Sequence, residues 1–284
     1  MRGWMSRSAL VRLASFVSLC VGACDGGSAA VWSDMITVPR AAYEEQISAD
    51  RVDFVALDLA TGRKLVLEGS QIYERHAPWS TFKILNTLIG LQADACLQPD
   101  ERLNWDAERW PSADFWPDAW RGDHDLESAF RNSVVWYYRQ IAQCVGGETY
   151  RETLADWRYG NAMLDIGDDG FWLGRDLQIS PWEQVLFLQQ LQLGEVDISA
   201  EHLERLHAIS LDQDDPDARL HGKTGAGARD GEGWEGWYVG YIRRDNQPGV
   251  VFALYARAQD YRDIRSFRRD FAIALLSDAG YLPD

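Results

Sequence analysis

Residues 78–91 read PWSTFKILNTLIGL, and the rest of the chain can be understood from this stretch outward. From Ser80 onward the apolar side chains recur at helical spacing, so residues 80–91 are predicted to form a helix, and Pro78 supports a helix start. Ser80 and Lys83 lie three positions apart, so they share one face of that helix and the amine can reach the hydroxyl. A buried lysine can lose its proton and act as a base, and a helix N-terminus favours developing negative charge. The pair predicts an activated serine nucleophile.

Strands are predicted on both sides of a helical middle section. A turn at Thr61-Gly62 suits a hairpin, and Ser180 with Glu183 forms a capping box at a helix start. The predicted strands are residues 53–57, 64–68, 220–224, 237–243 and 250–257, and the further helices are 126–145, 180–193 and 264–279. This order predicts an α+β fold in which both chain ends build an antiparallel sheet, flanked by terminal helices and packed against a helical lobe. The sheet lobe is expected from residues 36–75 and 215–284, and the helical lobe from 78–212.

Charge and composition indicate the class of partner. The formal net charge is -16, which opposes binding to nucleic acid or to an anionic membrane surface, since both attract clustered positive charge. Hydrophobic residues make up 46% of the 284 residues, enough for a substantial core. A small molecule is therefore the expected partner. If it is an anion, Lys223 and the arginines near the C-terminus are the cations expected to bind it.

The first 24 residues read as an export signal, because three arginines precede a short apolar stretch at 13–23. Cys24 also fits a bacterial lipoprotein cleavage site, at which it would be lipidated; cleavage near residues 29–30 is the alternative. In the lipoprotein interpretation, Asp25 resembles the signal for retention on the inner membrane. The mature domain is expected from residue 31 to 284, in the periplasm, with the membrane contacted only through such a lipid anchor.

Two cysteines remain beyond the signal, Cys96 and Cys144. In an oxidising compartment a disulfide between them can persist, although two buried free thiols fit the sequence as well. The five histidines show no spacing typical of a metal site. Neither a metal nor a nucleotide cofactor is expected.

A second lysine motif adds to the first. Lys223-Thr224-Gly225 lies on a predicted strand, where Lys223 and Gly225 share one face and the glycine leaves room for a substrate. Together with residues 80–83 it forms the serine-plus-lysine signature of penicillin-recognising enzymes. Three further motifs lie between these two, namely Ser133-Val134-Val135, Tyr159-Gly160-Asn161 and Phe171-Trp172-Leu173. Their order and spacing resemble those of class D β-lactamases, the oxacillinase type, from about residue 35 to the C-terminus.

The resemblance implies a serine β-lactamase fold, related to the penicillin-binding transpeptidases, and an acyl-enzyme mechanism. Ser80 would attack the β-lactam carbonyl. Lys83, converted by carbon dioxide or bicarbonate into a carbamate, would be the general base for forming and hydrolysing the acyl-enzyme. The implied activity is hydrolysis of β-lactam antibiotics, which confers resistance to them.

The same resemblance assigns roles to the other motif residues. Ser133 would relay a proton to the leaving nitrogen with Lys223 nearby. The remaining assignments are a carbamate pocket (Val135, Trp172, Phe82), an oxyanion hole (N–H groups of Ser80 and Ala226), substrate contacts (Thr224, Gly225, Arg265, Trp120, Leu173) and a loop-shaping motif (Tyr159, Gly160, Asn161). The resemblance implies Arg265 as the ligand of the substrate carboxylate, within a group of arginines that also contains Arg262, Arg268 and Arg269.

Two related classes are the alternatives. One is the penicillin-sensing domain of a membrane receptor, which is acylated without turnover; such receptors carry several membrane spans ahead of the sensor, whereas this sequence shows one short signal. The other is a cell-wall transpeptidase, in which an asparagine would be expected at Val135. The sequence predicts neither the β-lactam spectrum nor the oligomeric state.

Overall fold

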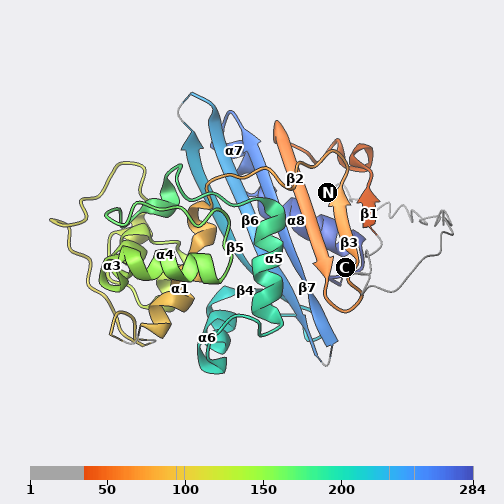
Figure 1. Ribbon diagram of the computed structural model, residues 1–284. Helices are drawn as coiled ribbons and strands as arrows, with labels where there is room; N and C mark the ends of the chain where they lie inside the picture. The colour runs from red at the N-terminus through yellow and green to blue at the C-terminus, as the bar shows by residue number, and fades with distance from the viewer. Residues whose placement is uncertain (1–34, 94, 99, 230, 246, 284) are drawn as a thin grey trace, which may run out of the picture. The chain divides into compact units, whose positions relative to one another are not determined.

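The computed structural model describes residues 35–283 apart from 94, 99, 230 and 246. The predicted export signal and Cys24 lie outside the described residues. Within the described part, the chain forms a seven-stranded sheet in the order β1-β3-β2-β7-β6-β5-β4, with helices on both faces (Figure 1). The predicted α+β arrangement is confirmed.

At the centre of the sheet, a strand from the N-terminal part of the chain pairs with a strand from the C-terminal part. β2 pairs antiparallel with β7 along eight residues, from Arg51 opposite Arg257 to Asp58 opposite Val250. Only β1 and β3 run parallel among the described strands; the other neighbours are antiparallel. The strands are β1 Met35–Val38, β2 Arg51–Asp58, β3 Lys64–Leu67, β4 Leu211–Gln213, β5 Arg219–Arg229, β6 Gly233–Arg244 and β7 Gln247–Ala258.

Helices cover the sheet on two sides and form the lobe beside it (Figure 1). α8 packs on β6 and β7 from one face, and α5 crosses β2 and β7 on the other. The helices are η1 Arg40–Tyr43, η2 Trp79–Phe82, α1 Lys83–Gln92, η3 Asp118–Trp120, α2 Leu126–Arg131, α3 Val135–Val145, α4 Gly147–Asp156, η4 Phe171–Leu173, α5 Pro181–Gln192, α6 Ala200–Ser210, α7 Tyr261–Arg265 and α8 Phe267–Asp278.

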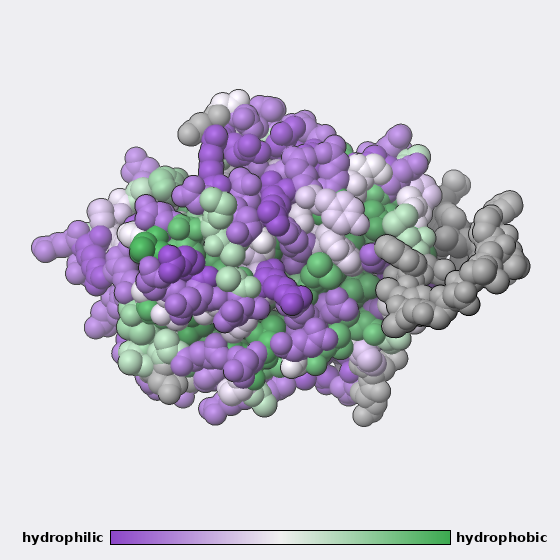
Figure 2. All heavy atoms as spheres, in the orientation of Figure 1, coloured by the Kyte–Doolittle hydropathy of each residue, from purple (hydrophilic) through white to green (hydrophobic). Residues whose placement is uncertain are grey.

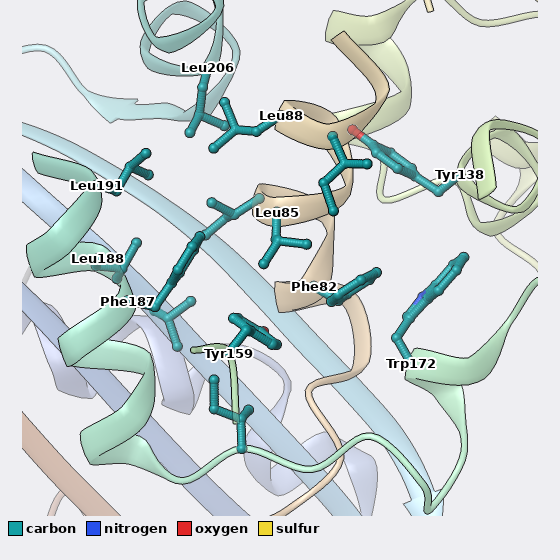
Figure 3. Packing of buried hydrophobic residues seen from close by; sticks show 14 of the residues in the cluster. Phe82, Leu85, Leu88, Tyr138, Tyr159, Trp172, Phe187, Leu188, Leu191 and Leu206 are labelled. Carbon is teal, nitrogen blue, oxygen red and sulfur yellow. The ribbon is translucent and has the colours of Figure 1, made fainter. Parts of the chain in front are cut away.

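Strand alternation divides the buried apolar residues into two clusters, one on each face of the sheet. Trp237 and Val239 of β6 belong to the cluster shared with the helical lobe, whereas Tyr238 belongs to the cluster under α8. In the helical lobe, Phe82 lies between Trp172 and Tyr159, as Figure 3 shows. The residue next to Lys83 is thus part of the core, and this packing fixes the position of the helix that carries the nucleophile.

Some helices and strands of the structure differ from the predicted ones in their bounds or were not predicted. The helix predicted at 126–145 is two helices, because Ser133 adopts a left-handed backbone with φ of 57° between α2 and α3. The terminal helix is likewise divided at Ser266 into α7 and α8. The capping box at Ser180 and Glu183 is present at the start of α5. The short strands β1 and β4 and the helices α4 and α6 were not predicted.

Cys96 and Cys144 are joined by a disulfide, with their Cα atoms 5.5 Å apart. The bridge connects the segment after α1 to the end of α3.

Polar residues cover much of the face in Figure 2, with apolar patches between them. Among the described residues, no helix has the length and apolar character needed to cross a membrane.

Two buried histidines give the fold a predicted dependence on pH. Burial, assisted by the charge of Arg243, lowers the pKa of His207 to about 3 and that of His221 to about 4. An unfolded chain binds a proton on each ring near pH 6.5. Stability is therefore full above that pH and falls below it, by roughly 2 kcal/mol per histidine at pH 5. Urea unfolding at pH 7.5 and 5 measures this loss.

Carboxylates also lose stabilising charge as the pH falls, so a variant is needed to isolate the contribution of His221 to the loss of stability. In His221→Gln the loss between the two pH values should shrink by about 2 kcal/mol, since one buried titrating ring is gone. His202→Gln, at a histidine that is only partly buried, is the matched control. An equal loss in wild type and His221→Gln would contradict the assignment.

Candidate active site

Ser80 and Lys83 meet at the junction of two helical segments. η2 contains Ser80 and continues into α1 at Lys83, so the chain enters the helix through a tight 3₁₀ turn. Nζ of Lys83 lies 2.7 Å from Oγ of Ser80, within hydrogen-bonding distance. The Lys83 side chain is fully buried, and burial, followed by the positive charge of Lys223, lowers its pKa well below the ordinary value. The structure thus favours an uncharged amine beside the hydroxyl.

Ser133 and Lys223 form a second serine–lysine pair. Nζ of Lys223 donates to Oγ of Ser133 at 3.0 Å and to the carbonyl of Thr224 at 2.8 Å. Burial, followed by the charge of Arg268, lowers the pKa of Lys223 to about 7. The left-handed backbone of Ser133 positions its hydroxyl at the break between α2 and α3, facing β5.

Glycines on β5 allow the strand to lie directly against the segment of the nucleophile. A Cβ added at Gly225 would lie 3.1 Å from both the Pro78 carbonyl and the Thr81 nitrogen, and one at Gly227 would lie 2.2 Å from the ring of Trp79. Larger residues at these positions would push the strand away. The glycines therefore bring the backbone on either side of Ala226 next to the backbone of Ser80. Ala226 and Ser80 are the two residues predicted to form the oxyanion hole.

The predicted carbamate pocket contains an unused donor. Trp172 is fully buried, its ring stacks on Phe82 at 5.4 Å, and its indole N–H has no hydrogen-bond partner among the described residues. A buried N–H without a partner is costly, so it marks a place for an acceptor. Nζ of Lys83 lies 5.4 Å from the ring centre of Tyr138, and Val135 is partly buried at the start of α3. An apolar pocket with one free donor fits a carboxylate added to Lys83.

A buried arginine lies near Lys223. Arg268 is 6% exposed, and its Nε and Nη1 atoms have no partner among the described residues. It passes Gly236 of β6, where an added Cβ would lie 3.2 Å from its Cδ. Thr224 pairs with Tyr238, so by strand alternation Thr224 faces the side of the sheet that Arg268 covers. The predicted carboxylate ligand Arg265 is exposed instead. Among the described arginines near the C-terminus, Arg268 is a better candidate for the carboxylate ligand than Arg265, because it is buried near Lys223 and has unpaired donors.

Known proteins resemble this chain in sequence and in fold. The family model of the penicillin-binding-protein transpeptidase domain matches residues 53–267. The probable β-lactamase YbxI of Bacillus subtilis is 34% identical over 193 residues, covering 68% of this chain and 70% of that protein. The crystal structure of the class D β-lactamase YbXI from Nostoc matches with a TM-score of 0.76 and 28% identity, covering 84% of this chain and 97% of that one. The chain belongs to the class D β-lactamase family.

Class D β-lactamases are not the only proteins with this fold. The C-terminal domain of the Bacillus licheniformis BlaR penicillin receptor matches with a TM-score of 0.79 and 25% identity, covering 89% of this chain and 99% of that domain. The fold expected from the resemblance, that of serine β-lactamases and penicillin-binding transpeptidases, is confirmed. The fold is therefore shared by β-lactamases and by a penicillin receptor.

The Tyr159-Gly160-Asn161 motif of this class D β-lactamase family member holds the loop that follows Trp172. Asn161 accepts the backbone N–H of Gln178 at 3.0 Å and donates to the Asp176 carbonyl at 2.7 Å. Gly160 has a φ of 58°, and a Cβ there would lie 2.1 Å from the Gln178 carbonyl, so only glycine fits. These contacts link the motif to residues 176–178, and its loop-shaping role stays a prediction.

The other predicted contacts lie around the two serine–lysine pairs. Trp120 is partly buried, and its indole N–H donates to the carbonyl of Asn132, the residue before Ser133, at 2.8 Å. Leu173 follows Trp172 and lines a pocket together with Trp79. These positions are compatible with the substrate contacts expected for Trp120 and Leu173.

Glu235 was missed by the sequence reasoning. It is 2% exposed, and its carboxylate accepts hydrogen bonds from the Trp79 indole N–H at 3.0 Å, from the Tyr255 hydroxyl at 2.8 Å and from Arg229 at 3.0 Å. Burial raises its pKa, but hydrogen bonds from His76, Trp79 and Tyr255 outweigh burial and lower it to about 2. The sequence signal that could have identified Glu235 is its position on the same face of β6 as the apolar residues Trp237 and Val239. Glu235 anchors Trp79, which directly precedes Ser80. The backbone of Trp79 is left-handed, with a φ of 50°.

Glu235→Gln should weaken both the fold and the site. The amide provides one acceptor where the carboxylate has two, so a buried donor loses its partner and stability should fall by about 3 kcal/mol. Trp79 would no longer be held, and kcat/KM for a chromogenic β-lactam should fall about tenfold. Urea unfolding and steady-state kinetics measure the two effects.

The matched control is Glu232→Gln, because Glu232 also pairs with Arg229 but is half-exposed. Its stability should change by less than about 0.5 kcal/mol. If both variants behave alike, Glu235 does not position Trp79.

Proposed function

We propose that the protein hydrolyses β-lactams through an acyl-enzyme on Ser80. The observation that carries this proposal is the buried Lys83 amine, with its pKa lowered, 2.7 Å from Oγ of Ser80. A serine hydroxyl is a weak nucleophile until a neighbouring base accepts its proton, and an uncharged amine can do so. Membership of the class D β-lactamase family supports the same reaction.

In the proposed reaction, Oγ of Ser80 bonds to the lactam carbonyl carbon and the C–N bond of the ring breaks. Lys83 takes the proton from Oγ. Ser133 delivers a proton to the departing ring nitrogen and regains one from Lys223, to which it is hydrogen-bonded; the proton that Lys83 received then restores Lys223. Water then adds to the ester carbonyl, and Ser80 leaves and regains its proton. The N–H groups of Ser80 and Ala226 are the proposed donors to the carbonyl oxygen in both steps.

Arg268 and Thr224 are proposed to hold the carboxylate on the β-lactam nucleus. The unpaired guanidinium N–H groups of Arg268 match the planar geometry of a carboxylate. N-carboxylation of Lys83 would supply a carboxylate oxygen as the base, and the free N–H of Trp172, with Phe82 and Val135 as apolar neighbours, would hold that group.

A periplasmic site of action is also proposed, because residues 1–24 read as an export signal. The Cys96–Cys144 bridge agrees with an oxidising compartment.

The second candidate function is penicillin sensing. It is favoured by the likeness to the BlaR receptor domain, which covers 89% of this chain. A sensor forms the acyl-enzyme but does not hydrolyse it.

Turnover of a chromogenic β-lactam separates the two functions. For a β-lactamase, excess substrate should be consumed over many cycles, with hydrolysed product far exceeding the protein concentration. For a sensor, colour should appear once, in an amount equal to the protein, and intact protein should retain the mass of the opened β-lactam. The latter result would overturn the proposed hydrolysis.

A further inference from the structure

A pocket of about 340 Å³ lies beside the nucleophile and is not used in the reaction above. Trp79, directly before Ser80, and Leu173, directly after Trp172, form part of its wall. Ala228 and Arg229 at the end of β5 form another part. The pocket thus borders the catalytic segments without containing a catalytic side chain.

Arginines are the main charged residues that line this pocket. Three arginines line it, Arg75, Arg175 and Arg229, against a single carboxylate, Glu235. Both oxygens of Glu235 already accept hydrogen bonds from the protein. In a chain with a net charge of -16, such a group of cations is unusual and points to an anionic ligand.

The three arginines differ in their availability. Arg75 is bound to Glu183 through several hydrogen bonds, and Arg229 pairs with Glu232 and Glu235. Arg175 is exposed and makes no hydrogen bond or ion pair with the described residues. Its guanidinium is therefore free to bind an incoming group, with the outer face of Arg229 as a second source of positive charge.

The position of the pocket along β5 indicates which part of a substrate can reach it. Lys223 and Thr224, at one side of Ala226, are near Arg268, the proposed site of the carboxylate on the nucleus. Ala228 and Arg229 lie two and three residues beyond Ala226, roughly 7–10 Å along an extended strand. The acyl side chain extends from the opposite side of the β-lactam, so it would run along β5 towards the pocket.

We propose that this pocket binds a carboxylate carried at the far end of the acyl side chain of a β-lactam, with Arg175 as its principal donor and Arg229 as the second. The inference rests on the proposed acylation of Ser80 and adds a substrate class to it. A side chain with a neutral end gains nothing from these cations.

Matched substrates test the charge directly. The probes are two penicillins with a benzyl side chain, one with a carboxylate and the other with a carboxamide at the para position of the ring. The two differ in charge but hardly in size. The readout is the second-order rate constant for acylation of Ser80, obtained as kcat/KM with turnover or as the rate of mass gain without it. The carboxylate should react about tenfold faster in wild type, and 1 M NaCl should reduce this ratio.

Variants identify the cation. Arg175→Gln should bring the carboxylate-to-carboxamide ratio down to about two, and Arg229→Gln should lower it less. The control Arg63→Gln removes one exposed arginine from the turn between β2 and β3 and changes the net charge equally. Its ratio should stay near ten.

The outcomes separate this inference from the proposed function. Acylation by both penicillins at equal rates, or an equal fall of the ratio in Arg175→Gln and Arg63→Gln, overturns the pocket while acylation of Ser80 stands. Absence of acylation by either penicillin in wild type overturns both.

Discussion

Lys83→Ala should lower β-lactam turnover by at least about 10³-fold, because it removes the base that activates Ser80. The amine lies 2.7 Å from Oγ and is fully buried, so bulk water does not replace it. Steady-state kinetics with a chromogenic β-lactam measure the loss. Urea unfolding of the same variant verifies that it is folded, since the substitution also leaves a cavity.

Lys64→Ala is the matched control. Lys64 lies on β3, and its ammonium is 4.1 Å from the ring centre of Trp182, with no contact to Ser80. Its removal should leave kcat within about twofold of wild type. Folded Lys83→Ala protein that retains more than a tenth of the wild-type kcat would show that another group is the base.

Arg268→Met should lower kcat/KM about 100-fold and leave stability equal or higher. Within the described part of the chain, the buried guanidinium has N–H groups without partners, so a methionine of similar length removes an unfavourable burial. With substrate bound, the same N–H groups would meet a carboxylate, and their loss raises KM more than it lowers kcat. The combination of a weaker site and an equally stable fold is specific to a ligand-binding arginine.

Arg265→Met tests whether Arg265, the ligand predicted from the sequence, binds the substrate carboxylate. Arg265 is exposed, so its substitution should change kcat/KM by less than about twofold. A larger loss for Arg265→Met than for Arg268→Met would restore the original choice. A marked loss of stability in Arg268→Met would instead indicate a structural role for the arginine.

Local sequence signals predicted much of the fold. The turn-forming Thr61-Gly62 between two apolar segments predicted the β2–β3 hairpin, and the Ser180–Glu183 capping box predicted the start of α5. The helix break at Ser133 was missed because the apolar pattern continues across it, and a left-handed serine leaves no mark in that pattern. β1 and β4 are only four and three residues long, too short for a periodicity to register.

The candidate site was predictable where motifs are contiguous and less so where distant elements meet. The Ser80/Lys83 spacing brings the two side chains together across the junction of η2 and α1. The choice between Arg265 and Arg268 depends on how α7 and α8 are joined at Ser266, which the spacing alone does not determine. Glu235 reaches Trp79 across 156 positions, and the free N–H of Trp172 becomes visible only once its surroundings are known.

The most direct test of the account is the charge state of Lys83. Only an uncharged amine adds carbon dioxide, so protein equilibrated with ¹³C-bicarbonate at neutral to alkaline pH should show a carbamate ¹³C NMR resonance. This resonance should be absent in Lys83→Ala and present in Lys64→Ala and Lys223→Ala. A hydrolytically active protein with no Lys83-dependent resonance, and with no response of turnover to bicarbonate after its removal, would contradict the account.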